Sequence, residues 1–382
     1  MIRLGTWLPF DRVPRELEAL LGVPLGAETV RRRTEAAGTA LVAAETAVVE
    51  RLERTWRRPP RCAVRQQVSV DGAMVPLVHG QWAEVKTLAI GHVVPRLGLD
   101  GTVEPAVIAL SYFSRLADAD TFRRLAWVET HRRGTTLAAD VCGPVDGSDW
   151  CQHFLDWHCP DALRILDFPH AGEHLATAAR SVYGAGTDAT TTWLKATLHT
   201  LKHGDPEQVL AALRALPLDA PTAAPDAAAT QAAVLQYLEK RRAQIQYAAF
   251  QAAGYPIGSG LVESANKLVV EARLKGSGMH WARPNVNPMV ALRAAACSDR
   301  WAEAWDQIAQ QRRIEAVARR AQRRAARAAA RPPAAPPSLP PQAGEASLAS
   351  PRRLPPRPRL IVNGRPTAAH PWRHSGLRRQ AG

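Results

Sequence analysis

The chain has 382 residues and a formal net charge of +14, enough length for two or three domains with a sizeable core. The charge excess is confined to residues 311–382, which hold 16 arginines, no lysine and two acids, so that residues 1–310 are close to neutral. We find no signal peptide, no apolar run near the length of a membrane span, and no CxxC pair or zinc spacing among the five cysteines. These features argue against membrane, zinc-finger and disulfide-rich classes and predict a cytoplasmic protein.

Residues 1–60 are predicted to be helical. Candidate helices at Arg12–Leu21 and Ala27–Ala37 are joined by a short turn that contains Gly22 and Gly26. The second helix carries three consecutive basic residues, Arg31, Arg32 and Arg33. Two short helices with a basic second member are typical of a helix-turn-helix that reads DNA, although an ordinary helix pair has the same outline.

Residues 61–170 change to the period of β-strands. Apolar and polar residues alternate over Gln67–Leu77, and Asp71 falls in the middle of this run, where a carboxylate is disfavoured unless it is paired or binds a metal. The elements predicted after it are strands at 82–93 and 106–113, a helix at 118–133, a strand at 135–145, a helix at 148–158 and a strand at 162–166. This order predicts an α/β, RNase H-like domain with a mixed five-stranded sheet.

The rest of the chain contains the closing part of that domain. Residues 171–253 are predicted to form an α-helical insertion, and residues 254–310 return to the core with a helix over about Leu261–Lys275. Glu263 lies in the first turn of this helix, where a carboxylate also complements the helix dipole and can pair with Lys267. Residues 311–382 are predicted to be a basic, mostly disordered tail whose partner is a polyanion or only solvent.

Three carboxylates are therefore expected at one edge of the sheet. Asp71 comes from a strand, Asp146 follows the fourth strand, and Glu263 comes from the closing helix. Hard oxygen ligands suit Mg²⁺ or Mn²⁺, and two such ions can share three carboxylates with the phosphate oxygens of a substrate. The pattern indicates metal-dependent phosphoryl transfer.

Several long segments resemble the bacterial insertion-sequence transposases of the ISKra family, which are DDE enzymes with an RNase H-like fold. The resemblance covers about Leu8–Trp305, with a further match at Asn363–Trp372. It is carried by the segments SVDGAMVPL, WAEVKTLAIG, PVDGSDWCQHFLDWHCPDALRILDFPHAGEHL, YPIGSGLVESANKLVVEARLKGSGMHW and SDRWAEAW.

The resemblance implies a catalytic triad. Its first aspartate matches Asp71, its glutamate matches Glu263, and we favour Asp146 over Asp167 as the second aspartate. Asp167 and His170 match an Asp-x-x-His pair that follows in related Mutator-like enzymes. His170 is then an active-site or DNA-contacting group, or alternatively a core histidine.

Candidate DNA contacts cluster around the Glu263 helix. Lys267, Arg273 and Lys275 could hold backbone phosphates, or could belong to a solvated face. Trp281 could stack on an unpaired base, although a tryptophan in the core is the simpler alternative.

Together these features predict a nucleoid-associated DNA transposase. It would cleave the ends of its element and join the freed 3′-hydroxyl to target DNA, acting as a homo-oligomer on double-stranded DNA. Compared with the family, the chain is expected to be shortened at its N-terminus. A catalytically idle DNA-binding remnant and a host nuclease of RNase H-like fold are the alternative functions.

Overall fold

The computed structural model describes residues 1–60, 62–98, 101–330, 361–362 and 365–366. The chain divides into two compact units, Met1–Arg324 and Ala325–Gly382. The four segments that we delimited within residues 1–310 all fall inside the first unit. Most of the predicted disordered tail and most of Asn363–Trp372 lie outside the described residues. Among the described helices, none combines the length and the apolar character that crossing a membrane requires.

A mixed five-stranded sheet in the order β3-β2-β1-β4-β5 forms the centre of the first unit. β1, β2 and β3 form an antiparallel meander, and β4 and β5 run parallel to β1 on its other side. The strands are β1 (Cys62–Pro76), β2 (Trp82–Leu97), β3 (Val103–Arg115), β4 (Ala138–Val145) and β5 (Leu163–Leu166). The alternating sequence therefore predicted all five strands, and the α/β class with a mixed five-stranded sheet is confirmed.

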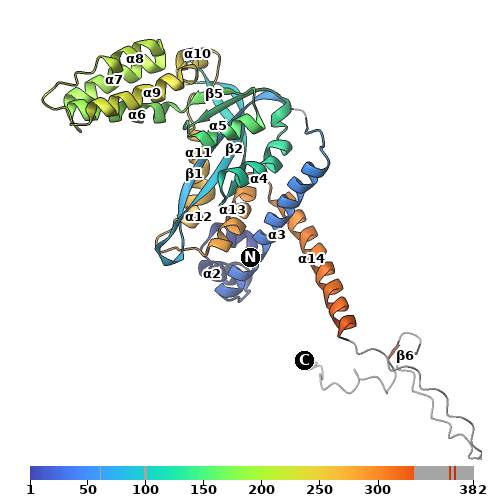
Figure 1. Ribbon diagram of the computed structural model, residues 1–382. Helices are drawn as coiled ribbons and strands as arrows, with labels where there is room; N and C mark the ends of the chain where they lie inside the picture. Colours follow the sequence, from blue (N-terminus) through green and yellow to red (C-terminus); the bar gives the residue numbers. More distant parts are fainter. Residues whose placement is uncertain (61, 99–100, 331–360, 363–364, 367–382) are drawn as a thin grey trace, which may run out of the picture. The chain divides into compact units, whose positions relative to one another are not determined.

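Both faces of the sheet are covered by helices (Figure 1). α4 (Ala119–Arg132) and α5 (Asp149–His158) cover one face, where Phe122 and Phe154 pack on Val68 and Ile90. The segment that follows the insertion, together with α13 (Arg283–Cys297), covers the opposite face. Because neighbouring residues of a strand point to opposite faces, Val70 packs in the first layer whereas Asp71 points into the second.

The predicted insertion is helical and packs beside β5 (Figure 1). It contains α6 (Phe168–Tyr183), α7 (Asp188–His203), α8 (Pro206–Arg214), α9 (Ala227–Lys240) and α10 (Tyr247–Ala252). Gly184 adopts a left-handed φ of 90°, which ends α6 and lets α7 begin four residues later.

The Glu263 helix is one continuous run with an irregular middle. It consists of α11 (Gly260–Ala265), a π-helical turn, η4 (Asn266–Glu271), and α12 (Ala272–Leu274). A π-turn changes the hydrogen bonding of the helix and leaves carbonyl groups that need other donors. The buried Arg293 of α13 supplies them, because its guanidinium donates to the carbonyls of Leu268 and Val269.

Three N-terminal helices follow one another at the start of the chain, and the first and third pack against α13. They are α1 (Ile2–Trp7), α2 (Arg12–Leu21) and α3 (Ala27–Arg54). The predicted end of the second helix at Ala37 was wrong, since α3 continues to Arg54 and buries Leu41 against Leu292 of α13. This long, core-packed helix fits the ordinary helix pair of the two alternatives better than a short recognition helix. α14 (Trp301–Ala329) leaves the core and crosses the boundary between the units, and β6 (Ile361–Val362) pairs with β7 (Arg365–Pro366) in the second unit.

Candidate active site

Asp71 lies on the central strand, facing the Glu263 helix. Its backbone pairs with Thr87 of β2, and its carboxylate is partly buried. The side-chain amide of Asn266 donates a hydrogen bond to Asp71 Oδ2 over 2.8 Å. Asn266 is the first residue of the π-turn, so this bond joins the middle of β1 directly to the helix that carries Glu263.

Asp146 follows β4 at the same level of the sheet as Asp71. β1 and β4 are parallel, with Gln67 paired to Cys142, and continuing this register along both strands brings Asp146 beside Asp71. The chain turns at Gly147, and Asp146 Oδ1 accepts a hydrogen bond from the amide of Ser148 over 2.9 Å. The strand order thus places these two aspartates together without any contribution from the helices.

Glu263 completes the group from α11. Its side chain is exposed, and the hydroxyl of Ser259 donates to Glu263 Oε1 over 3.2 Å. Ser259 is the residue that precedes α11, so the bond fixes the carboxylate relative to the start of its own helix. The exposed backbone N–H groups at this helix start also favour a negative charge here.

The electrostatics of Asp71 report that the three carboxylates are close. Burial raises the pKa of Asp71, and the negative charges of Asp146 and Glu263 raise it further. Hydrogen bonds from the Gly72 backbone and from Asn266 act in the opposite direction. Three like charges around a partly buried group are unfavourable unless a cation or bound protons offset them.

The donor chemistry of this group fits a divalent metal ion. Carboxylate oxygens are the ligands that Mg²⁺ and Mn²⁺ prefer, and the side-chain oxygen of Asn266 is buried without a hydrogen-bond partner. In the described part of the chain, however, no three His, Cys, Asp or Glu side chains are arranged to hold one ion. Asp71, Asp146 and Glu263 are the residues that would hold the ions.

Asp167 has a different environment from Asp146. It is buried, Oδ2 accepts the amide of His170 as the N-terminal cap of α6, and Oδ1 accepts the amide of Ser259 over 2.6 Å. Both carboxylate oxygens are therefore bonded to backbone. Because Ser259 also donates a hydrogen bond to Glu263, Asp167 supports Glu263 indirectly, through Ser259.

His170 lies on the first turn of α6 and is partly exposed. Its Nδ1 is 3.6 Å from Glu173 Oε2, and its ring meets that of His174 edge-on at 4.9 Å between centroids. It is therefore not the fully satisfied core histidine of the alternative interpretation. The buried histidine of the domain is His158, which bonds to Thr130 and to the carbonyl of Arg123.

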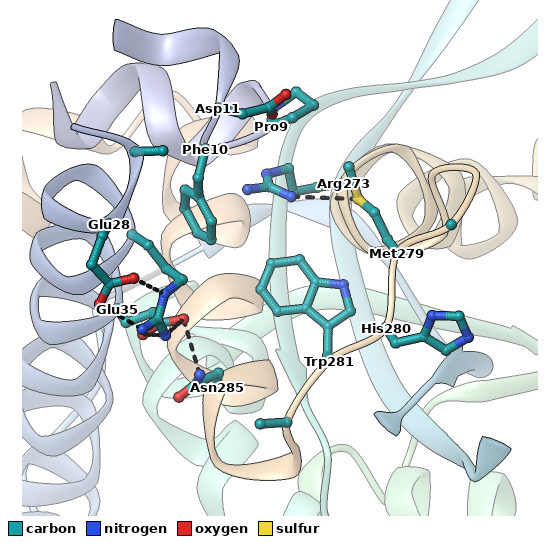
Figure 2. A pocket seen from close by; sticks show the side chains of 14 residues that line it. Pro9, Phe10, Asp11, Glu28, Glu35, Arg273, Met279, His280, Trp281 and Asn285 are labelled. Carbon is teal, nitrogen blue, oxygen red and sulfur yellow. Dashed lines mark hydrogen bonds and ion pairs between the residues drawn. The ribbon is translucent and has the colours of Figure 1, made fainter. Parts of the chain in front are cut away.

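Several residues predicted to contact DNA meet around a cavity of about 510 Å³ instead (Figure 2). Trp281 is buried, donates its indole N–H to the Leu274 carbonyl, and packs edge-on against Phe10. Arg273 is also buried, with its guanidinium 4.6 Å from the centre of the Phe10 ring and 5.1 Å from that of Trp281. Burial lowers the pKa of Arg273 to about 10.

These positions agree with the core alternative that we left open for Trp281, and they place Arg273 in the interior. Neither Trp281 nor Arg273 presents a free surface to a base or a phosphate, because their long apolar parts complete the core beneath the cavity. Arg31 also lines this cavity, where its guanidinium pairs with Glu28 over 2.7 Å and with Glu35 over 3.0 Å. Arg32 and Arg33 are exposed.

The two lysines of the Glu263 segment differ from each other. Lys267 is exposed one turn beyond Glu263, as a phosphate contact requires. Lys275 is exposed as well, but its ammonium group pairs with Glu271 over 2.7 Å. Lys267 therefore remains the better candidate for a DNA contact near the carboxylates.

α14 presents a basic surface that sequence composition alone did not resolve. At 3.6 residues per turn, its arginines share one side of the helix, while Ala318, Ala321 and Gln322 lie on the other. The arginines of this surface within the first unit are Arg312, Arg313, Arg319, Arg320, Arg323 and Arg324. We call this set the α14 arginine face.

Sequence reasoning missed the polar residues that support the carboxylates. Asn266 and Ser259 both lie within the Tyr255–Trp281 segment, but an asparagine or a serine in a helical run has no signal that distinguishes a bond to a distant carboxylate. No family model matches the chain, and no curated protein matches it either.

Proposed function

We propose that this chain is a metal-dependent DNA strand transferase with an RNase H-like catalytic domain, and more particularly a DDE transposase. The observation that carries the proposal is that Asp71 and Asp146 lie at the same level of two neighbouring parallel strands, with Glu263 close enough for its charge to raise the pKa of Asp71. The resemblance to the ISKra transposases adds the particular reaction, which is cleavage at the element's ends followed by strand transfer.

Each of these residues would have a separate role in the reaction. Asp71, Asp146 and Glu263 would hold two divalent ions, with Asn266 orienting Asp71 and Ser259 orienting Glu263. When bound, the ions would polarise the scissile phosphate and activate the attacking water or 3′-hydroxyl. The α14 arginine face and Lys267 would hold the DNA through its phosphates.

The test uses duplexes made from the inverted repeats that are expected to flank the gene. Purified protein with Mg²⁺ or Mn²⁺ should nick the repeat end and, when given a pre-cut end with a free 3′-hydroxyl, should join it to a target plasmid. Asp71→Asn and Glu263→Gln should abolish both products and leave DNA binding intact, since each keeps the side-chain volume. Cleavage at a near wild-type rate in either variant would refute the assignment.

The same assay separates the proposal from its nearest alternative. A host nuclease of RNase H-like fold would cut DNA or an RNA–DNA hybrid without joining a 3′-hydroxyl to the target. Cleavage without any joined product, with the pre-cut end as well, would favour that nuclease over the transposase.

A further inference from the structure

The helical insertion contacts the core at the turn that carries Asp146. Tyr237 of α9 donates its hydroxyl to the Asp146 carbonyl over 2.8 Å. Arg241, the residue after α9, donates from Nη2 to the Gly147 carbonyl over 2.5 Å. Both bonds cross from the insertion to consecutive backbone carbonyls of the same turn.

The two donors are themselves held rigidly. The Tyr237 ring is stacked on His174 with 3.9 Å between ring centroids, and the Arg241 guanidinium lies 3.8 Å from the centre of the Tyr237 ring. Arg241 also donates to the Tyr237 carbonyl over 3.1 Å and is buried. A stacked, hydrogen-bonded pair of this kind loses little additional freedom when it binds the turn.

The turn is shaped to receive these side chains. Gly147 adopts a left-handed φ of 79°, and a Cβ atom there would lie 2.5 Å from the Tyr237 hydroxyl and 2.7 Å from Arg241 Nε. The side chain of Asp146 is fixed from the other direction by the Ser148 amide. The Asp146 carboxylate and the carbonyls of Asp146 and Gly147 therefore each have a hydrogen-bond partner, although the turn lies between a strand and a helix.

Simple packing of the insertion would not require this arrangement. The apolar cluster shared by β5 and the insertion, which includes Ile165, Leu175 and Leu238, already joins the two parts. A second bridge, from Tyr247 to the Leu166 carbonyl over 2.8 Å, joins them without touching Asp146. The Tyr237–Arg241 pair differs from these contacts because it binds the turn that bears the Asp146 carboxylate.

We propose that Tyr237 and Arg241 are positioning residues for Asp146, so that the insertion contributes to the geometry of the active site. This inference rests on the proposed function. Partners that orient a metal-binding carboxylate typically change metal affinity by roughly 10–100-fold when they are removed. The pair should therefore act on metal affinity more than on folding.

The experiment measures Mn²⁺ binding to the full-length protein without DNA, by titration with detection of free Mn²⁺ by electron paramagnetic resonance. Tyr237→Phe and Arg241→Lys should weaken Mn²⁺ binding by roughly 10–100-fold. Cleavage should be partly restored at high Mn²⁺, which a general loss of folding would not allow. Tyr247→Phe is the matched control, since it removes a tyrosine–carbonyl bond of the same length and should leave Mn²⁺ affinity near the wild-type value.

Asp146→Asn serves as the reference and should weaken Mn²⁺ binding most. If it does so while Tyr237→Phe and Arg241→Lys both bind Mn²⁺ within twofold of wild type, the positioning role is refuted and the proposed function survives. An equal loss in Tyr247→Phe would also refute it, by showing that any bridge to the insertion has the same effect. Unchanged Mn²⁺ binding in Asp146→Asn would overturn the metal site, and both proposals with it.

Discussion

Asn266 and Asp71 are joined by a hydrogen bond of 2.8 Å between residues 195 positions apart in the chain. The amide nitrogen faces the carboxylate, and the amide oxygen is buried without a partner on the other side. Asn266 is the first residue of a π-turn in the helix run, a feature often found at functional sites. The hydrogen bond ties the central strand to the helix of Glu263 and sets the first carboxylate in place.

We expect Asp71→Asn to stabilise the metal-free protein while it abolishes activity. Because the pKa of Asp71 is raised in the folded state, folding binds protons at this site, and its contribution to stability falls as the pH rises through that pKa. The substitution removes the buried charge, so the melting temperature should rise by about 2 °C at pH 7. The gain should be smaller near pH 4, where Asp71 is partly protonated.

Thermal melting in EDTA at both pH values measures this effect. Asp140→Asn is a useful control, since Asp140 lies on the same sheet but pairs with Arg65 over 2.6 Å. It should destabilise the protein or leave it unchanged. A fall in melting temperature for Asp71→Asn at pH 7 would contradict the electrostatic account.

Asp146→Asn and Asp167→Asn should differ in the size of their effects on cleavage. Asp146→Asn removes a group next to Asp71 and should eliminate activity. Asp167→Asn keeps an effective helix cap but weakens the bond to the Ser259 amide, so that Glu263 is less well fixed. We expect a loss of roughly 10–100-fold, as for other supporting partners of metal ligands.

Single-turnover cleavage of a repeat-end duplex distinguishes the two variants. Ser259→Ala should resemble Asp167→Asn, because it removes the hydroxyl that binds Glu263. Complete inactivity of Asp167→Asn with residual activity of Asp146→Asn would reverse our choice of the second aspartate.

The α14 arginine face should determine much of the salt dependence of DNA binding. Replacing Arg312, Arg319, Arg320 and Arg323 with glutamine removes up to four phosphate contacts. Each lost contact makes the slope of log affinity against log salt shallower by about 0.9 on duplex DNA. Affinity should fall to a similar extent for unrelated sequences, since phosphate contacts carry no base information.

A charge-matched variant provides the control for this titration. Replacing Arg352, Arg353, Arg357 and Arg359 with glutamine removes the same charge from the tail. We expect this variant to change the slope of log affinity against log salt less than the α14 variant does, because α14 holds its arginines on one side before DNA binds. Equal slopes for the two variants would show that net charge, and not the face, governs binding.

His158 should make the fold sensitive to acid. Burial lowers its pKa to about 3, so the folded protein keeps the ring neutral while the unfolded chain binds a proton below about pH 6.5. A lowered histidine pKa means that stability is lost as the pH falls below the unfolded value, by about 1.4 kcal/mol per pH unit until the folded pKa is reached.

Urea unfolding between pH 7.5 and pH 5 checks this dependence. His158→Gln should lower stability at every pH but should flatten its decline with acid, whereas the exposed His153→Gln on the same helix should leave the decline unchanged. If His158→Gln keeps the wild-type slope, another group is responsible for the acid sensitivity.

The order of the strands and helices followed from the sequence pattern, and so did the expectation that Asp71 and Asp146 lie near each other. Strand alternation and helical periodicity are local patterns, and residues that follow neighbouring parallel strands come together at one edge once the strand order is known. The class of the fold and the candidate carboxylates therefore followed from short stretches of chain.

The residues that support or surround these carboxylates became evident only from the packing of the chain in three dimensions. Arg273 and Trp281 could be surface or core by composition, and they became core because Phe10, from the other end of the chain, covers them. The supporting residues bind partners that are mostly far away in the sequence. The bonds of Tyr237, Arg241 and Asn266 span 91, 94 and 195 positions, and that of Ser259 spans four. Such contacts depend on side-chain packing in three dimensions, which a linear pattern of residue types does not encode.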